Sequence, residues 1–418
     1  MTGMNLVRYL CFLFCLSFSP VLIAEPLTTL QLEDKLAIQS RSNDKKLAKL
    51  IGNWELSERL ATPRLIELEK KLPGPLSRQA LIAIADVSAF LQPPTDETPK
   101  LSPPDQDTQL SMLRRTIVLT GQQLHQLPDF LVMRSTTRFE DLHVAAQSSP
   151  VVVLERQPFE IKDQFQVVVT YRDGREDVQP HDKELAKQSQ RTPSGLNELG
   201  SFGPLLQVDN KPAEPSQELP SGLSELGSFG PLLQIVLSDV LHGKIAWTRW
   251  ETGTSYPLAV FQYSVAQEKS NYTVNYCCKI TNPSAKKPEN PFFQAQLAYD
   301  GEVSIDPRSG AVMRLTVLAS FDVAQPISEV RTLIEYGAVE IGGRSYICPR
   351  KSLSYPHTKR TILLRDGFCV NDSCSPSMWK DAGVIAINDS TYESYRLFRA
   401  DMKILPADSA NPGSLPEK

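Results

Sequence analysis

The sequence predicts an α+β protein, in which an N-terminal helical segment precedes a C-terminal antiparallel β-sheet. Three observations support this class. Apolar residues recur at helical spacing before Leu127, apolar and polar residues alternate with a period of two after Lys244, and the strands of that second region are separated by connections of hairpin length. Because hairpins join antiparallel neighbours, helices and strands are expected to form separate parts of the fold.

Composition limits the possible functions. The chain has 418 residues, which is enough for two or three domains. Its hydrophobic content of 41% and charged content of 22% are ordinary for a globular protein with a packed core. The net charge of −4, together with the lack of a basic stripe interleaved with aromatic residues, argues against a nucleic-acid partner.

Residues 1–24 have the pattern of a secretory signal peptide. Arg8 precedes an apolar run, Tyr9–Phe18, and Ala24 supplies a small residue at the expected cleavage point. The run is short for a bilayer span and Pro20 follows it, so cleavage is favoured over the alternative, a short membrane anchor. We therefore expect a periplasmic or secreted protein that has no transmembrane segment once the signal is removed.

A helical domain is expected over residues 25–127. A stripe at i, i+3, i+4 and i+7 is formed by Leu47, Leu50, Ile51 and Trp54. Thr62-Pro63 has the chemistry of an N-cap followed by the first helical position, and Ala80–Leu91 is almost entirely apolar and should be buried. A proline-rich linker, 93–108, precedes one more helix. The apolar residues of that helix are Leu110, Leu113, Ile117, Leu124 and Leu127.

A short β segment is expected over residues 128–177. Its strand candidates are Phe130–Phe139, Val151–Arg156 and Phe165–Tyr171, and Asp173-Gly174 marks a turn. The next residues, 178–220, are polar and contain prolines, so we expect a disordered insert.

The chain contains a duplicated 14-residue motif. Ser194–Gln207 recurs 27 residues later as Ser221–Gln234, and the copies differ only at Asn197 and Ser224. Solenoids have three or more diverged repeats, so these two copies indicate a recent tandem duplication. The second copy continues into the apolar run Ile235–Leu237 and can begin an amphipathic helix. We expect this copy to pack and the first to lie in an inserted loop; a doubled binding motif is the functional alternative.

An antiparallel β domain with a leading helix is expected over residues 221–405, followed by a disordered tail, 406–418. Eight segments have strand character: Ile245–Trp250, Leu258–Val265, Tyr272–Ile280, Gln296–Ile305, Ala311–Ser320, Arg331–Ile341, Arg344–Tyr355 and Tyr392–Ile404.

Two turns in this domain have specific chemistry. Asp306–Gly310 offers an aspartate that can bond to its own backbone, a proline that sets φ, and a glycine that accepts a positive φ. Gly342-Gly343 is a two-residue hairpin turn between alternating strands. Both turns predict hairpins in succession.

Five cysteines follow the signal peptide, and export permits disulfides. Cys369 and Cys374 enclose a short polar loop and are the first predicted pair. Cys278 and Cys348 lie on the apolar parity of their strands and are the second, which leaves Cys277 unpaired. These spacings fit no common zinc pattern, and the five histidines show no paired spacing. We therefore predict neither a metal site nor a cofactor.

Nucleophile motifs are weak. Ser42–Lys45 and Ser377–Lys380 match the short Ser-x-x-Lys pattern without its companion motifs. Cys348 with His357 could be a thiol and its base, but a cysteine on the apolar parity of a strand suits packing or a disulfide better than an activated thiolate. No catalytic residue is predicted, and a serine or cysteine hydrolase is kept as the least favoured of three functional hypotheses.

Aromatic residues are frequent in the β domain. They can simply form the core, or they can line the concave face of a curved sheet that holds a hydrophobic ligand beneath the helix near residues 230–242. The candidates for such a ligand face are Trp247, Trp250, Phe261, Tyr263, Tyr276 and Tyr299.

The segment Tyr299–Arg314, with its strand, Asp-Pro-x-Ser-Gly turn and strand, resembles LolA-like periplasmic proteins, which include lipoprotein carriers of the outer membrane. The resemblance covers the C-terminal part of the chain. It implies an unclosed antiparallel half-barrel, with helices over an apolar concave face that holds acyl chains. Tyr336–Gly343 and Tyr346–Pro349 also make the whole chain resemble a group of uncharacterised bacterial exported proteins.

The leading functional hypothesis is an exported non-enzymatic protein that binds a lipid, an acyl group or a protein partner on the apolar face of the half-barrel. The alternative is a structural or interaction protein of the envelope whose sheet face is filled by its own side chains. The carrier hypothesis requires a continuous apolar pocket beneath a helix, and the hydrolase requires a nucleophile and base that converge in a cleft.

Overall fold

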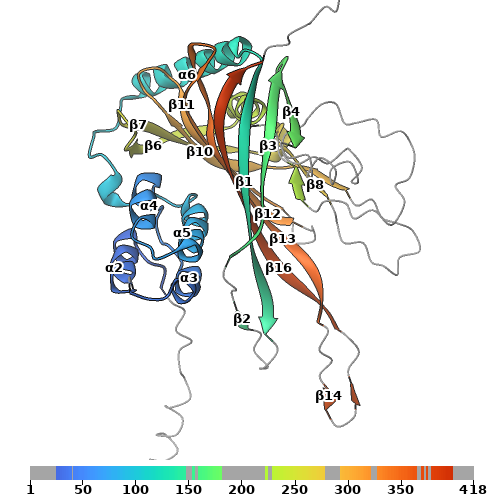
Figure 1. Cartoon of the computed structure of the whole chain (residues 1–418). Coiled ribbons are helices and arrows are strands. Elements are labelled where there is room, and N and C mark those ends of the chain that lie inside the picture. Colours follow the sequence, from blue (N-terminus) through green and yellow to red (C-terminus); the bar gives the residue numbers. More distant parts are fainter. Residues whose placement is uncertain are drawn as a thin grey trace, which may run out of the picture.

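The computed structural model describes part of the chain: residues 25–39, 41–146, 153–155, 159–180, 222–224, 228–277, 292–321, 327–364, 369–370, 373–374 and 378–398. The predicted signal peptide, the predicted tail and nearly all of the predicted insert lie outside these residues. In the described part the chain is an α+β protein with an open antiparallel sheet, as the sequence predicts (Figure 1).

Most helices lie in the N-terminal part of the chain. The α-helices are α2 (Thr29–Gln39), α3 (Asp44–Gly52), α4 (Thr62–Glu69), α5 (Pro75–Ser88), α6 (Gln106–Gln126) and α8 (Pro231–Val240). Two single turns of 3₁₀-helix are η1 (Thr95–Glu97) and η2 (Gln267–Lys269). In Figure 1 the helices α2–α5 form a group beside the sheet, whereas α6 runs across one end of it.

The strands are β1 (Phe130–Ala146), β2 (Val153–Glu155), β3 (Glu160–Arg172), β4 (Arg175–Pro180), β5 (Gly222–Ser224), β6 (Lys244–Glu251), β7 (Leu258–Val265), β8 (Thr273–Cys277), β9 (Phe292–Gln296), β10 (Tyr299–Ile305), β11 (Val312–Ser320), β12 (Ile327–Ile341), β13 (Arg344–Leu364), β14 (Cys369–Val370), β15 (Ser373–Cys374) and β16 (Met378–Leu397). The main sheet has the order β4-β3-β1-β16-β13-β12-β11-β10-β7-β6, with β2 paired to β1. Two smaller sheets are β14-β15 and β5-β8-β9.

The segment predicted as a separate short β segment is part of the main sheet. Strand β1 pairs with β16 over almost its whole length, from Phe130 opposite Leu397 to His143 opposite Gly383. Strands β3 and β4 continue the same sheet beyond β1. The partner of β1 is thus more than 200 residues away in sequence, which no local pattern can reveal.

Several predicted strands have different limits in the structure. The last strand, predicted as Tyr392–Ile404, is β16 and begins at Met378. The predicted strand Gln296–Ile305 is divided between β9 and β10, which belong to different sheets. The polar stretches of β13 and β16 alternate poorly in sequence. Most of their residues nevertheless pair regularly with each other, because each strand completes the backbone hydrogen bonds of its neighbour.

Both predicted turns form as expected. Gly310 has φ +85° and Asp306 accepts a hydrogen bond from the backbone N–H of Arg308 at 2.9 Å. Gly342 and Gly343 have φ values of +60° and +81°, which fits a two-residue turn between β12 and β13.

The two faces of the sheet are covered by different helices, as two neighbouring residues of β11 illustrate. Leu315 points into the core beneath α8, whereas Arg314 points the other way and donates to the carbonyl oxygen of Ala89, just after α5. We name these sides the α8 face and the α5 face. The α5 face is also packed by a cluster that includes Ala83 of α5 and Phe139, Tyr355 and Ile387 of the sheet.

Helix α6 covers one end of the α8 face with part of the predicted stripe: Leu113 and Leu127 pack against buried clusters, and Leu124 lines a small cavity. Its buried residues are Met112, Thr116 and Thr120, while Leu110 and Ile117 are 42% and 37% exposed. The buried hydroxyl of Thr116 donates to the carbonyl oxygen of Met112 at 3.1 Å, so a polar residue is satisfied within the helix. The hydrophobic periodicity therefore predicts part of the covered side of α6, and the position of the sheet adds Met112, Thr116 and Thr120 to it.

Candidate functional site

The predicted ligand-face residues whose side chains the structure describes lie on the α8 face, where they form the core. Phe261 and Tyr263 are 1% exposed and Tyr299 is 3% exposed, in one cluster with the apolar side of α8. Trp247 and Trp250 are partly buried against the same cluster, with ring centroids 4.9 Å apart. The side chain of Tyr276 lies outside the described part of the structure. The fold thus brings five of the six candidates into one packed cluster.

The polar groups of these aromatic residues bond to the protein itself. Tyr263 donates to the carbonyl oxygen of Thr316 at 2.5 Å, and Tyr299 donates to Oδ2 of Asp239 in α8 at 2.9 Å. The indole N–H of Trp250 donates to the carbonyl oxygen of Ser102, in the linker before α6, at 3.0 Å. These bonds fix the rings in the core, so the hydroxyl and indole groups are already satisfied without a ligand.

The space left beneath α6 and α8 is small. A cavity of about 20 Å³ lies between these helices and the sheet, and its lining includes Leu124, Phe229, Leu233, Tyr336 and Ile347. This volume can hold a water molecule, whereas pockets for drug-sized ligands measure about 300–1,000 Å³. In the part of the chain that the structure describes, this cavity is far smaller than the continuous apolar pocket that a carrier requires.

The turn that leads into α8 inserts one ring among four others. Phe229 is 3% exposed and is surrounded by a group that we name the aromatic cage. The cage consists of Phe130, Tyr171, Tyr392 and Tyr395, whose ring centroids lie 5.2, 6.2, 5.3 and 6.1 Å from that of Phe229. Three of these contacts are edge-on or nearly so, a geometry that stabilises aromatic pairs beyond the area they bury.

Polar contacts hold the same turn in place. The backbone N–H of Phe229 donates to Oε1 of Glu176 in β4 at 2.8 Å, and the hydroxyl of Tyr392 donates to Oγ of Ser228 at 3.0 Å. Pro231 then occupies the first turn of α8, where its missing N–H costs nothing. Complete burial raises the pKa of Glu176 to about 7, despite the hydrogen bond from Phe229 and the nearby guanidinium of Arg134.

A second small cavity, also about 20 Å³, lies beside the cage on the α8 face and is lined mainly by polar side chains. Its lining comprises Arg134, Ser228, Thr332, Ile334, Ser352, Leu353, Ser354, Asn388, Ser390 and Tyr392. Apart from Ser228, in the turn before α8, these residues come from β1, β12, β13 and β16, four adjacent strands of the sheet. The volume again fits a water molecule, which hydroxyl groups and a guanidinium could bind.

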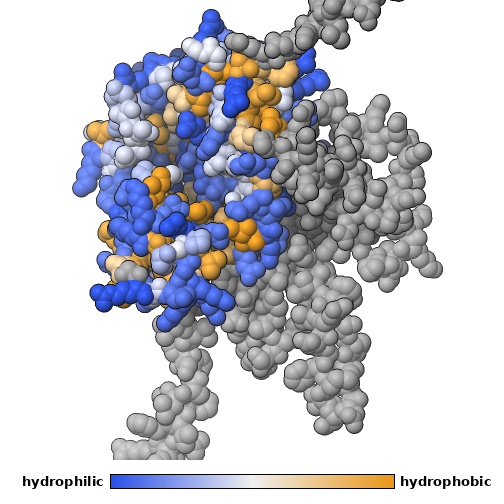
Figure 2. Space-filling model, in the orientation of Figure 1, coloured by the Kyte–Doolittle hydropathy of each residue, from blue (hydrophilic) through white to orange (hydrophobic). Residues whose placement is uncertain are grey.

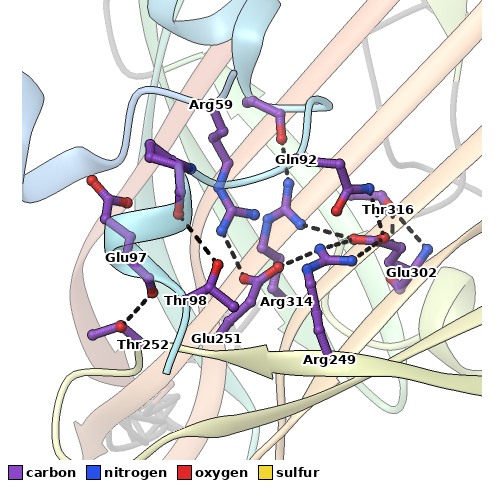
Figure 3. Close-up of polar contacts among 12 residues, drawn as sticks. Arg59, Gln92, Glu97, Thr98, Arg249, Glu251, Thr252, Glu302, Arg314 and Thr316 are labelled. Atoms are coloured by element: carbon purple, nitrogen blue, oxygen red, sulfur yellow. Dashed lines mark hydrogen bonds and ion pairs between the residues drawn. The ribbon is translucent and has the colours of Figure 1, made fainter. Parts of the chain in front are cut away.

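On the α5 face, an ion-pair network joins the helical domain to the sheet (Figure 3). Arg249 makes a bidentate contact with Glu302, at 2.7 and 2.6 Å, and Arg59 from the helical domain reaches Glu251 at 2.7 Å. Burial, together with the like charge of Arg59, lowers the pKa of Arg314 to about 10. The charges are paired with one another, so this network is suited to holding the helical domain against the sheet rather than to catalysis.

A second junction lies further along the α5 face. Nζ of Lys351 in β13 is 2.8 Å from Oδ1 of Asp86 in α5 and 3.3 Å from Oδ1 of Asp389 in β16. Burial, and then the neighbouring charge of Asp389, raises the pKa of Asp86. The sequence showed neither junction, because their members are isolated charged residues on different elements.

The candidate nucleophiles are not assembled into a site. Cys348 is a buried free thiol, so a bridge from it to Cys278 is not present; Cys278 itself lies outside the described residues. Burial raises the pKa of Cys348 to about 12, which opposes thiolate formation. His357 is nine positions away on the same strand, which corresponds to roughly 30 Å. Ser42 donates to Oε1 of Gln39 at 2.9 Å.

The first predicted disulfide remains a prediction. Cys369 and Cys374 are opposite each other in the β14-β15 ladder, a placement that brings two Cβ atoms close. Their side chains lie outside the described part, as does Ser377. Among the described residues no group of three or more His, Cys, Asp or Glu could hold a metal ion, and no helix has the length and hydrophobicity to cross a bilayer.

Comparisons with family models, with curated proteins and with solved structures give no match to this chain.

Proposed function

We propose that this chain is an exported, non-enzymatic interaction protein whose α8 face accommodates a protein segment rather than a lipid. The observation that carries the proposal is the occupation of that face by the chain's own residues 228–240. Phe229, Leu232 and Val236 are 3%, 1% and 1% exposed there, and they fill the place that an acyl chain would take beneath a helix.

The surface of the protein supports an interaction role. Helix α6 exposes Leu110, Ile117 and Val118, the last to 58%. On the face seen in Figure 2, hydrophobic residues form small separate patches among hydrophilic ones. A non-obligate protein interface is on average no more apolar than such a surface, so an interaction here needs no larger apolar patch.

The likeness to LolA-like proteins motivates the rival function, an acyl carrier. An open antiparallel sheet with a helix over one face agrees with that likeness. The two functions differ in the volume that they require beneath the helices, and lipid uptake tests whether that volume is available.

The test uses the mature protein purified from a bacterial periplasm. We expect native mass spectrometry to show no bound acyl lipid and a fluorescent fatty acid to show no saturable uptake, with a known acyl-binding protein as the positive control. Two variants make the test specific: Ile347→Trp fills the cavity beneath α6 and α8, and Leu110→Trp adds the same ring at an exposed position of α6. Uptake by the parent protein that Ile347→Trp abolishes and Leu110→Trp retains would establish the carrier and overturn the proposal.

A further inference from the structure

The segment that fills the aromatic cage has a twin in the same chain. Ser228–Gln234 is identical, residue for residue, to Ser201–Gln207 in the first copy of the duplicated motif. The first copy lies outside the described residues, whereas residues 228–234 of the second copy pack, as the sequence predicts. The molecule therefore contains one cage and two segments with the same cage-binding chemistry.

Each contact that holds the second copy uses a group that the first copy repeats. The cage surrounds a phenylalanine ring, Glu176 accepts from the backbone N–H of that phenylalanine, and Tyr392 donates to the preceding serine. The following glycine is close to α6, since a Cβ at Gly230 would lie 2.5 Å from Cδ2 of Leu124. A serine, a phenylalanine and a glycine in this order meet all of these requirements.

We propose that the aromatic cage is a binding site for the Ser-Phe-Gly segment of either copy, and that Phe202 is its second ligand within the same chain. This inference rests on the proposed function, because it takes the α8 face to be a site for protein segments. The occupant is residues 201–203 of the same molecule.

The sequence after each copy explains why the second copy is the resident. Helix α8 continues with Val236, which is 1% exposed, and with Asp239, which accepts from the N–H of Asn271 at 2.7 Å and from the hydroxyl of Tyr299 at 2.9 Å. The equivalent positions after the first copy are Asp209 and Pro212. Asp209 would place a carboxylate at the buried position of Val236. Pro212 would place a proline inside the helix and remove the hydrogen bonds that Asp239 accepts. Both changes are unfavourable. The first copy can therefore replace the turn at the cage but not α8.

The chain is long enough for this exchange. Residues 181–200 connect the end of β4, at the edge of the sheet, to the first copy, and 20 extended residues span up to about 70 Å. Seating Phe202 while α8 stays in place would turn residues 204–230 into a loop. The entropy cost of closing a loop rises only slowly with its length, so the exchange carries a moderate penalty that keeps Phe229 in the cage of the parent protein.

A double-mutant cycle on the mature full-length protein tests the inference. The variants are Phe202→Ala, Phe229→Ala and the double variant, which make the same substitution in the same motif. Phe202→Ala should leave the Tm unchanged, and Phe229→Ala should lower it moderately because Phe202 takes over the cage. The double variant should lower the Tm by about twice the shift of Phe229→Ala or more, since neither ring remains. A double variant that matches Phe229→Ala, or a Phe229→Ala protein that does not fold, would overturn the inference.

A spectroscopic readout reports the occupant directly. A fluorinated phenylalanine placed at position 202 should show one ¹⁹F chemical shift in the parent background and a different, ring-shifted resonance in the Phe229→Ala background. An unchanged resonance would contradict the exchange. A shift that grows with protein concentration would place Phe202 in the cage of another molecule and overturn the intramolecular assignment. Lipid uptake is measured separately, so each outcome leaves the proposed function to its own test.

Discussion

Glu176 is a carboxylic acid buried in β4 between the turn before α8 and the guanidinium of Arg134. Burial outweighs the hydrogen bond from Phe229 and raises its pKa to about 7, from an ordinary value near 4.5. The folded protein therefore holds this proton more tightly than the unfolded chain does. It follows that the contribution of Glu176 to stability is fully present below about pH 4.5 and declines as the pH rises towards 7.

Replacing Glu176 by glutamine should remove this pH dependence, because the amide keeps an acceptor for the N–H of Phe229 and does not ionise. We expect the stability of the parent protein, relative to Glu176→Gln, to fall by about 3 kcal/mol between pH 4.5 and pH 8. Urea unfolding at both pH values measures the difference. Glu160→Gln, at a side chain that is 75% exposed, is the control and should show no such change. An equal difference at both pH values would contradict the assignment.

At the scale of elements, β10 lies between β7 and β11, and its fit depends on one glycine. Gly301 is opposite Tyr263 in the ladder, and the tyrosine hydroxyl crosses over it to reach the carbonyl oxygen of Thr316. A Cβ at Gly301 would lie 1.9 Å from that carbonyl oxygen and 2.7 Å from the hydroxyl. A backbone atom cannot move away as a flexible side chain can, so any side chain here must displace a strand.

Gly301→Ala should therefore destabilise the protein by about 3 kcal/mol, as overpacking of a well-packed core does. The matched control is Gly121→Ala in α6, where a Cβ meets no atom within 4 Å. The control should be neutral or stabilising by up to about 1 kcal/mol, because alanine favours a helix over glycine. Chemical denaturation measures both. A Gly301→Ala protein as stable as the parent would show that β10 and β11 are less tightly packed than described.

At the scale of the whole molecule, we expect that the duplication can be removed without a change of fold. Deleting Val208–Gln234 joins the first copy to Ile235 and restores the sequence that enters α8, apart from asparagine in place of Ser224. We expect this chain to keep the Tm of the parent to within a few degrees, because a difference of less than 1 kcal/mol shifts the Tm of a domain of this size little. Thermal unfolding followed by circular dichroism measures it.

The control for this deletion removes only Ser221–Gln234. That chain retains the first copy, whose Phe202 can still reach the cage, but it enters Ile235 through residues 208–220, so α8 loses its first turn and the buried Leu232. A marked loss of stability is expected. If both deletions behave alike, the second copy does not hold the place that the structure gives it.

The sequence by itself determined the fold class, the two turns at Asp306–Gly310 and Gly342-Gly343, and the choice of the second motif copy as the one that packs. These features depend on local chemistry: a period of two, glycine at positive φ, and an apolar run after a proline. Local patterns also placed Phe261, Tyr263 and Tyr299 on one side of their strands, although they could not show whether that side was filled.

Only the tertiary structure decided the rest. It joined β1 to β16, buried Thr116 and Thr120 of α6 while exposing Leu110 and Ile117, and filled the α8 face with residues 228–240. It also assembled the aromatic cage, the buried Glu176 and the ion-pair network of the α5 face from distant strands. The physical reason is that burial and pairing depend on which elements meet in space, and a single chain's periodicity records only that one side of an element is apolar, not what covers it.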